Sequence, residues 1–422
     1  MRRAGVLASA VAGELRLRLA DLLGEQVARG VTAATFHSIC ARILREHACV
    51  FGRTENYTVY DQTDVRRVVE WLLSDQQRGQ IQRALADYGQ PAAAEVLAEI
   101  SLAKNRLLSP DSYGHAARHL AAPVIATVWR EAEIELQRSN SFDFDDLLVY
   151  AVRLLAEHPH RLAFYRQRWR WLLVDEYQDT NEAQSVLVAL LAGPAGNVCC
   201  VGDVDQLLYS WRGAESRNML AFGERFPAHT RIVLGRNFRC RAEILEAAVA
   251  CVAHNAQREP KALIANRGAG GEVRVVAHGT DRHEAQSVAA AISQALAQGI
   301  PASEVLVLGR TGYSLWPVQA ALAQAGIPHR VLGSLGLYER SEVRDALAYL
   351  ALLVNPADAQ AFRRAVGSPR RGAARRAARC RAATDSAGRV LRRPSPWRGR
   401  RARSTGRCAA RCEPSRGPAR TG

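Results

Sequence analysis

The sequence has few of the features that would place it in a membrane, in a secreted disulfide scaffold or around a structural metal. No run of 18 apolar residues occurs, and the apolar stretch behind Met1-Arg2-Arg3 is too short for a signal peptide. None of the nine cysteines forms a C-x-x-C pair, and Cys408 and Cys412 have no histidine at zinc spacing. These absences predict a globular cytoplasmic protein in a reducing compartment, without a zinc site.

Lysine is also scarce, since the chain has only Lys104 and Lys261 against 55 arginines, which points to GC-rich coding. The formal net charge of +16 suggests a nucleic-acid partner, but residues 370–422 carry +15 of it, with 17 arginines and two acidic residues. The rest of the chain is therefore almost neutral. We expect 371–422 to be a disordered arginine-rich tail. It is either a segment without selected structure, read from a shifted frame, or a basic DNA-binding arm; the near-absence of lysine favours the first.

Length and periodicity predict an α/β protein of two or three domains. Leucines recur at helical spacing over 10–30, and most of 38–160 has helical stripes. Strands and helices then alternate, as in parallel sheets flanked by helices. The predicted strands are 171–175, 197–202, 231–234, 272–277, 304–308 and 328–332. The predicted helices after residue 180 are 182–192, 283–298, 313–325 and 340–353.

The most informative motif is an apolar run, residues 171–174, that ends abruptly in Asp175 and Glu176. A strand that delivers carboxylates to its carboxyl end is how α/β nucleotide enzymes hold Mg²⁺ and orient a water molecule. An isolated Asp-Glu pair is more often a solvated strand end. The following Tyr-Gln-Asp-Thr favours the functional interpretation here.

Two further motifs follow in order. Gln206 comes just after the strand predicted at 197–202, and Tyr209 and Trp211 follow it among small and polar neighbours, as expected of an exposed stacking platform. The third motif is Arg236-Asn237-Phe238-Arg239. Together with 171–181, these motifs closely resemble the UvrD/Rep/PcrA family of superfamily-1 DNA helicases, and the resemblance covers roughly residues 10–370.

The resemblance implies RecA-like motor domains of the P-loop NTPase class, with ATP and Mg²⁺ as cofactors. Asp175 would hold the Mg²⁺, Glu176 would act as general base, and Gln206 would sense the γ-phosphate. Arg239 would reach the same phosphate across the cleft between the motor domains. Phe238 would stack on the adenine.

The resemblance also implies a path for single-stranded DNA and contacts with duplex junctions. Thr35, Phe36 and His37 match the family's T-F-H block, which lines that path, and Tyr209 and Trp211 would stack on bases. Arg212 would join the polar network around the phosphates. A generic nucleotide-binding protein of another class is a weaker alternative, because it gives no reason for the block from Gln206 to Trp211.

The domain boundaries that we expect follow the same resemblance. The predicted segments are 1–40 (part of the first motor domain), 41–140 (inserted helical subdomain), 141–258 (rest of the first domain), 259–271 (linker), 272–356 (part of the second domain), 357–370 (start of a further helical subdomain) and 371–422 (tail).

The chain departs from the family at both ends. No G-x-x-x-x-G-K-[ST] phosphate loop occurs, and the usual T-N-K-A-A block reads Ala8-Ser9-Ala10-Val11-Ala12. The last helicase motifs are also missing. We therefore expect an ATP-dependent 3′–5′ helicase of DNA repair or replication, truncated here and poorly active alone. The alternatives are an inactive DNA-binding remnant, or one half of a split helicase completed by a separately encoded remainder.

Overall fold

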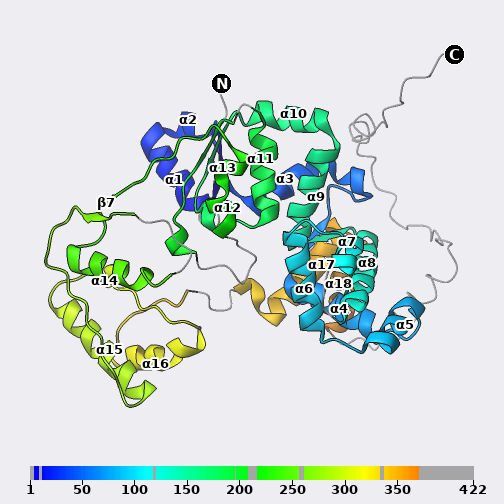
Figure 1. The fold of residues 1–422 in the computed structure, drawn as a ribbon. Coiled ribbons are helices and arrows are strands. Elements are labelled where there is room, and N and C mark those ends of the chain that lie inside the picture. Colours follow the sequence, from blue (N-terminus) through cyan, green and yellow to red (C-terminus); the bar gives the residue numbers. More distant parts are fainter. Residues whose placement is uncertain are drawn as a thin grey trace. The chain divides into compact units, whose positions relative to one another are not determined.

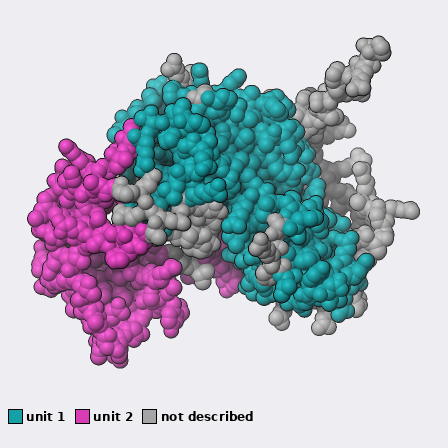
Figure 2. Space-filling model, viewed as in Figure 1, with its two compact units in different colours: residues 1–231, 348–422 teal, residues 232–347 magenta. Residues whose placement is uncertain are grey.

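The structure is a computed structural model that describes residues 4–8, 12–116, 120–194, 196–207, 216–255, 261–332 and 337–369. The chain forms two compact units (Figure 2). Unit 1 comprises residues 1–231 and 348–422, and unit 2 comprises residues 232–347. Within the described residues, no helix has the length and apolar character that a membrane crossing requires.

Unit 1 contains a parallel four-stranded sheet with the order β2-β1-β5-β6. Its strands are β1 (Ala4–Ala8), β2 (Thr32–Thr35), β5 (Trp171–Val174) and β6 (Val198–Cys200). Leu173 lies beside Val6 on one side and beside Cys199 on the other. The strands predicted at 171–175 and 197–202 are thus confirmed, while β1 and β2, which are short and rich in alanine, were missed by sequence reasoning.

Eight helices of the described residues accompany this sheet (Figure 1). They are α1 (Ala12–Leu23), α2 (Glu25–Ala28), α3 (Phe36–His47), α9 (Phe144–Glu157), α10 (Pro159–Arg168), α11 (Glu182–Ala192), α12 (Ser216–Leu220) and α13 (Phe222–Arg225). The helix predicted over 10–30 is split at Gly24, whose φ of 78° does not continue a helix. α1 packs against β2, and α3 and α11 pack against α9. Ile43, Leu154 and Leu187 join Val174 of β5 in one apolar core.

A layer of helices interrupts the sheet between β2 and β5. It contains α4 (Gln62–Ser74), α5 (Gly79–Tyr88), α6 (Ala93–Asn105), α7 (Pro110–Ala116) and α8 (Ala122–Arg138). These helices have their own core, built on Leu72, Val96 and Trp129. A parallel pair of short strands, β3 (Thr58–Tyr60) and β4 (Ser141–Asp143), joins the start and the end of the layer.

The end of the described chain returns to this helical layer (Figure 1). The returning elements are α17 (Ser341–Val354) and α18 (Ala359–Gly367). The side chain of Asn355 donates to the carbonyls of Ser139 and Asn140, at 3.1 and 3.0 Å. The Tyr60 hydroxyl donates to Asp358 Oδ1 at 2.9 Å. A contact between residues almost 300 positions apart therefore closes unit 1.

Unit 2 is mainly helical in its described residues. Its helices are α14 (Ala242–Val252), α15 (Asp281–Ala297), α16 (Trp316–Gln324) and the first turns of α17. Short 3₁₀ turns occur in both units: in unit 1 at Ala48–Phe51, Tyr177–Asp179 and Val204–Gln206, and in unit 2 at Ala302–Glu304, Tyr313–Leu315 and Leu337–Glu339. The helices predicted at 283–298, 313–325 and 340–353 are confirmed, and α15 and α16 share a small core around Ala289 and Leu322.

The strands predicted in unit 2 are wrong. Residues 231–234, 272–277, 304–308 and 328–332 carry no strand, and their apolar side chains are largely exposed, as at Val275 (98%) and Leu308 (83%). The described strands of this unit are the parallel pair β7 (Arg236–Asn237) and β8 (Ile264–Ala265). A strand forms only where a neighbour completes its hydrogen bonds, and an apolar run alone does not supply one.

The pair β7–β8 also bears on the predicted boundary between the first domain and its linker. Residues 232–258 were assigned to the first domain, but they belong to unit 2, because β7 is hydrogen-bonded to β8. Within the predicted linker, the backbone N–H groups of Gly270 and Gly271 donate to the carboxylate of Glu243 at 2.9 and 2.8 Å. Residues 261–271 are therefore packed onto α14 and β7.

Candidate functional site

The turn after β5 presents both predicted catalytic carboxylates to solvent. Leu172 and Val174 face the core while Trp171 and Leu173 are about half exposed, so β5 alternates and is not buried on both faces. Asp175 and Glu176 are exposed, and Asp175 Oδ1 accepts the backbone N–H of Glu176 at 3.0 Å. Glu176 has φ 51°, a left-handed conformation that is uncommon outside glycine and often occurs at functional sites.

A line of hydrogen bonds joins this turn to the segment after β6. Gln178 Nε2 donates to Glu176 Oε2 at 2.7 Å, and Gln178 Oε1 accepts the backbone N–H of Asp203 at 2.9 Å. Asp203 Oδ2 in turn accepts Gln206 Nε2 at 2.9 Å. Glu176 and Gln206 are exposed at the two ends of the line, and Gln178 is buried between them. The structure thus brings the predicted Glu176 and Gln206 together, through two residues that sequence reasoning missed.

Gly202 is what lets the two strand ends approach this closely. A Cβ atom on Gly202 would lie 2.6 Å from Gln178 Oε1 and 3.2 Å from the backbone nitrogen of Gln178. Both distances are shorter than van der Waals contact. The glycine before Asp203 is therefore the sequence signal that could have indicated a close approach between the two loops.

Buried asparagine side chains fix the turn that contains Glu176. Asn181 caps α11 by accepting the N–H of Gln184 at 2.9 Å, and its Nδ2 donates to Asn105 Oδ1, at the end of α6, at 2.5 Å. Asn218 Nδ2 donates to the carbonyl of Thr180 at 2.7 Å. The turn that follows Glu176 is thereby fixed to both the helical layer and α12.

The Thr-Phe-His block lies at the carboxyl end of β2, on the same edge of the parallel sheet as Asp175. Thr35 caps α3 by accepting the N–H of Ser38 at 3.2 Å. The ring of His37 stacks on Phe144 with centroids 3.8 Å apart, and burial lowers the pKa of His37 to about 4. The predicted DNA contact of Phe36 is corrected by the structure, because the ring of Phe36 is 2% exposed and packs in the core.

The remaining predicted residues lie elsewhere. Phe238 (66% exposed) and Arg239 follow β7 in unit 2, where Asn237 Oδ1 accepts the backbone N–H of Arg239 at 3.0 Å. Tyr209, Trp211 and Arg212 lie outside the described residues.

The carboxylates fit a magnesium ion of the kind that nucleotides bring with them. No group of three or more histidine, cysteine or acidic side chains that could hold a metal occurs in the described parts of the chain. Mg²⁺ in nucleotide sites is usually bound through one or two carboxylates, with phosphates and water completing the shell. The exposed carboxylate of Asp175 suits that arrangement, because among the described residues its one hydrogen bond is to the neighbouring backbone, through Oδ1.

Comparison with known proteins identifies the class. Residues 7–227 match the UvrD/REP helicase N-terminal domain, and residues 232–381 match the UvrD-like helicase C-terminal domain. The chain therefore belongs to the UvrD/REP helicase family, whose motor domains imply a RecA-like α/β fold.

Individual relatives agree with this family. The chain is 38% identical over 363 residues to the ATP-dependent DNA helicase PcrA of Leuconostoc citreum, covering 86% of this chain and 47% of that protein. It is 38% identical over 382 residues to the ATP-dependent DNA helicase UvrD1 of Mycobacterium tuberculosis (87% and 48%). The PcrA protein of Bacillus subtilis is 34% identical over 362 residues (86% and 48%). The chain spans about half the length of these relatives.

Proposed function

We propose that the chain is part of an ATP-dependent DNA helicase that moves 3′ to 5′ along single-stranded DNA in repair or replication. The observation that carries this proposal is the hydrogen-bonded line from Glu176 through Gln178 and Asp203 to Gln206. It connects a carboxylate suited to hydrolysis with an amide suited to sensing phosphate. The names of the relatives support the same activity.

In this proposal Asp175 holds the Mg²⁺ of bound ATP, and Glu176 orients and deprotonates the attacking water. The metal, when bound, neutralises charge that develops on the phosphates. Gln178 fixes one oxygen of Glu176, and this leaves the other oxygen to accept a hydrogen bond from water. The left-handed backbone of Glu176 (φ 51°) ends the strand abruptly, and we infer that this turn lets Glu176 and Asp175 act on the same nucleotide.

Gln206 would transmit the state of the nucleotide to DNA. Its amide is held by Asp203, so a γ-phosphate that attracts this amide would disturb the line back to Glu176. Tyr209 and Trp211 follow three and five residues later, where we place contacts with unpaired bases. Thr35 and His37 would line the strand path, and the buried Phe36 would support them from the core.

Three further side chains complete the proposed nucleotide site. Phe238, exposed after β7, would stack on the adenine, and Arg239 would reach the γ-phosphate with a planar guanidinium. Arg212 would join the same polar network. These three roles rest on the family motifs that the chain contains.

The test is ATP hydrolysis by the purified chain with and without single-stranded DNA, beside the variant Glu176→Gln. Loss of a general base typically lowers the rate by about 100-fold or more. DNA-stimulated hydrolysis that Glu176→Gln abolishes would support the proposal. Unchanged hydrolysis in the variant would remove Glu176 from the reaction. Partial duplexes with a 3′ or a 5′ tail then report the direction of unwinding.

A chain that does not hydrolyse ATP still separates the alternatives. DNA binding that weakens in Trp211→Ala would identify a DNA-binding remnant. Hydrolysis that appears only when a separately expressed segment carrying a phosphate loop is added would identify a split motor. Neither hydrolysis nor DNA binding, with or without that segment, would contradict the proposed function.

A further inference from the structure

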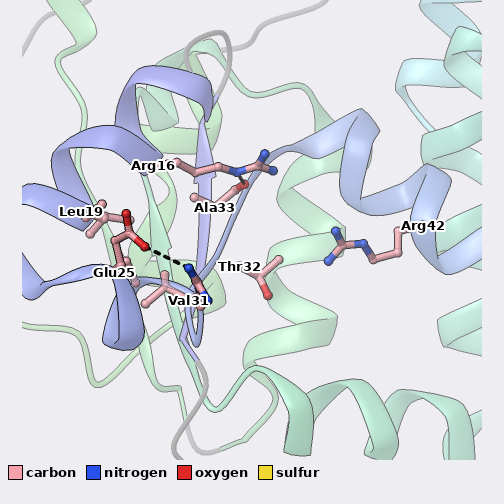
Figure 3. Close-up of a pocket in the computed structure, with 10 residues that line it drawn as sticks. Arg16, Leu19, Glu25, Val31, Thr32, Ala33 and Arg42 are labelled. Atoms are coloured by element: carbon pink, nitrogen blue, oxygen red, sulfur yellow. Dashed lines mark hydrogen bonds and ion pairs between the residues drawn. The ribbon is translucent and has the colours of Figure 1, made fainter.

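A polar cavity lies in unit 1, away from the site described above. It has a volume of about 430 Å³ and is lined by α1, α2, the start of β2 and α3 (Figure 3). Thr32 opens β2 at this cavity, whereas Thr35 closes β2 at the edge of the sheet that carries Asp175. Three residues of strand span roughly 10 Å, so the cavity and the Thr-Phe-His block are separate features.

Two arginines converge on this cavity. Figure 3 shows the guanidinium groups of Arg16, from α1, and Arg42, from α3, directed into the same space beside Thr32. Arg16 Nε donates to the carbonyl of Ala33 at 2.9 Å, which fixes the group and leaves its terminal nitrogens available. Neither arginine forms an ion pair with a carboxylate among the described residues.

The other charges of the cavity do not neutralise this pair. Glu25 is engaged by Arg29, whose Nη2 lies 2.9 Å from Glu25 Oε2. Arg16 and Arg42 therefore line one cavity as two cations that no carboxylate of the described residues pairs with. An oxyanion between them would relieve their repulsion and accept hydrogen bonds from both guanidinium groups. The geometry of a phosphate group suits this arrangement.

The size and lining of the cavity limit which kind of molecule can bring an anionic group into it. Its lining also includes the apolar side chains of Leu19, Ala28 and Val31, while Thr32 offers a hydroxyl group. A volume of about 430 Å³ falls within the range of small-ligand sites. We propose that this arginine cavity binds a phosphate group, carried by a nucleic-acid strand or by a small free phosphate, independently of the proposed ATP site.

The experiment compares the whole chain with Arg42→Gln and Arg16→Gln. Arg83→Gln is the matched control, because Arg83 is also exposed on a helix and donates from Nε to the carbonyl of Gly79 in its own helix. Arg42→Lys keeps the positive charge but removes the planar guanidinium group. One arm titrates inorganic phosphate by calorimetry. The other measures binding of a fluorescent oligo-dT strand over a range of salt concentrations.

We expect the affinity for at least one probe to fall about tenfold in Arg42→Gln and in Arg16→Gln, with only partial recovery in Arg42→Lys. Arg83→Gln should stay within about twofold. A loss confined to inorganic phosphate identifies a free-phosphate site. A loss confined to oligo-dT, with the salt slope reduced by about 0.7, identifies a strand phosphate. Equal binding of both probes by the chain, Arg42→Gln and Arg16→Gln overturns the proposal, whatever Glu176→Gln does to hydrolysis.

Discussion

At the scale of single residues, the site depends on conformations that most side chains avoid. Glu176 is one of three non-glycine residues with positive φ among the described residues, and the other two, Leu107 and Asn140, also lie in turns. Such a conformation costs on the order of 1 kcal/mol or more and persists only where its surroundings enforce it. Here the surroundings are Gln178 and the N–H of Tyr177, which donates to the carbonyl of Val201 at 2.9 Å.

His37 gives a prediction about pH at the same scale. Burial lowers its pKa to about 4, so the folded protein resists a proton that the unfolded chain accepts near pH 6.5. The stability that this contributes is fully present above pH 6.5 and is lost as the pH falls toward 4. Between pH 7.5 and pH 5 we expect a loss of about 1–2 kcal/mol in the free energy of unfolding, measured with urea.

The matched variants for this measurement are His37→Phe and His278→Gln. His37→Phe keeps a ring against Phe144 but cannot titrate, so its stability should fall less over the same pH range. His278 is exposed, and its replacement should leave the pH dependence as in the parent chain. A His37→Phe variant with the full decrease would contradict a buried neutral His37.

At the scale of elements, a buried ion cluster attaches the helical layer to α9, which accompanies the four-stranded sheet of unit 1. Lys104, near the end of α6, lies 2.5 Å from Asp143 Oδ2 and 2.7 Å from Asp146 Oδ1, and all three residues are buried. Burial opposes the charge of Lys104, but the two carboxylates outweigh it and raise the pKa of the lysine. Asp143 and Asp146 also form the capping box of α9, so one lysine secures both helices.

Lys104→Met should therefore be strongly destabilising, because it leaves two buried carboxylates without a cation. We expect the free energy of unfolding to fall by about 3–5 kcal/mol in urea. The control is Arg130→Gln, which removes an exposed ion pair with Asp111 and should cost no more than about 1 kcal/mol. Similar losses in both variants would mean that the cluster contributes no more than a surface pair.

How far the elements follow from the sequence depends on the range of the interactions that build them. β5, β6 and α11 were predicted because their apolar patterns and end residues are local signals. The link from Gln178 to Asp203, and the contacts of Lys104 and Asn105, were not predicted. They join residues 25 to 76 positions apart, and no local pattern records them. The failed strands of unit 2 show the same limit, since an apolar run does not specify a pairing partner.

At the scale of the whole molecule, the buried amide of Asn355 joins the part of unit 1 that follows unit 2 in sequence to the part that precedes it. Asn355 Nδ2 donates to Ser139, Asn140 and Thr58, and Asn140 Nδ2 donates to Asn355 Oδ1. Asn355→Ala would leave these groups without their buried partner. We expect it to cost about 2–4 kcal/mol and to speed proteolytic cleavage within α17 and α18.

The control for that prediction is Asn266→Ala, which removes an exposed amide of the same type from unit 2. It should change stability by less than about 0.5 kcal/mol and leave the cleavage pattern as it was. Unchanged proteolysis in Asn355→Ala would mean that α17 and α18 are held by their apolar contacts alone.

The return of the chain to unit 1 also restricts how unit 2 can move. The polypeptide leaves unit 1 after Arg231 and re-enters it at Ala348, so unit 2 is attached at both ends. A domain on one linker can rotate about any axis through its attachment. A domain attached twice is restrained at both attachments, so rotation about the line that joins them is its least restrained motion. Chain connectivity alone thus favours one kind of motion for unit 2, before any ligand or interface acts on it.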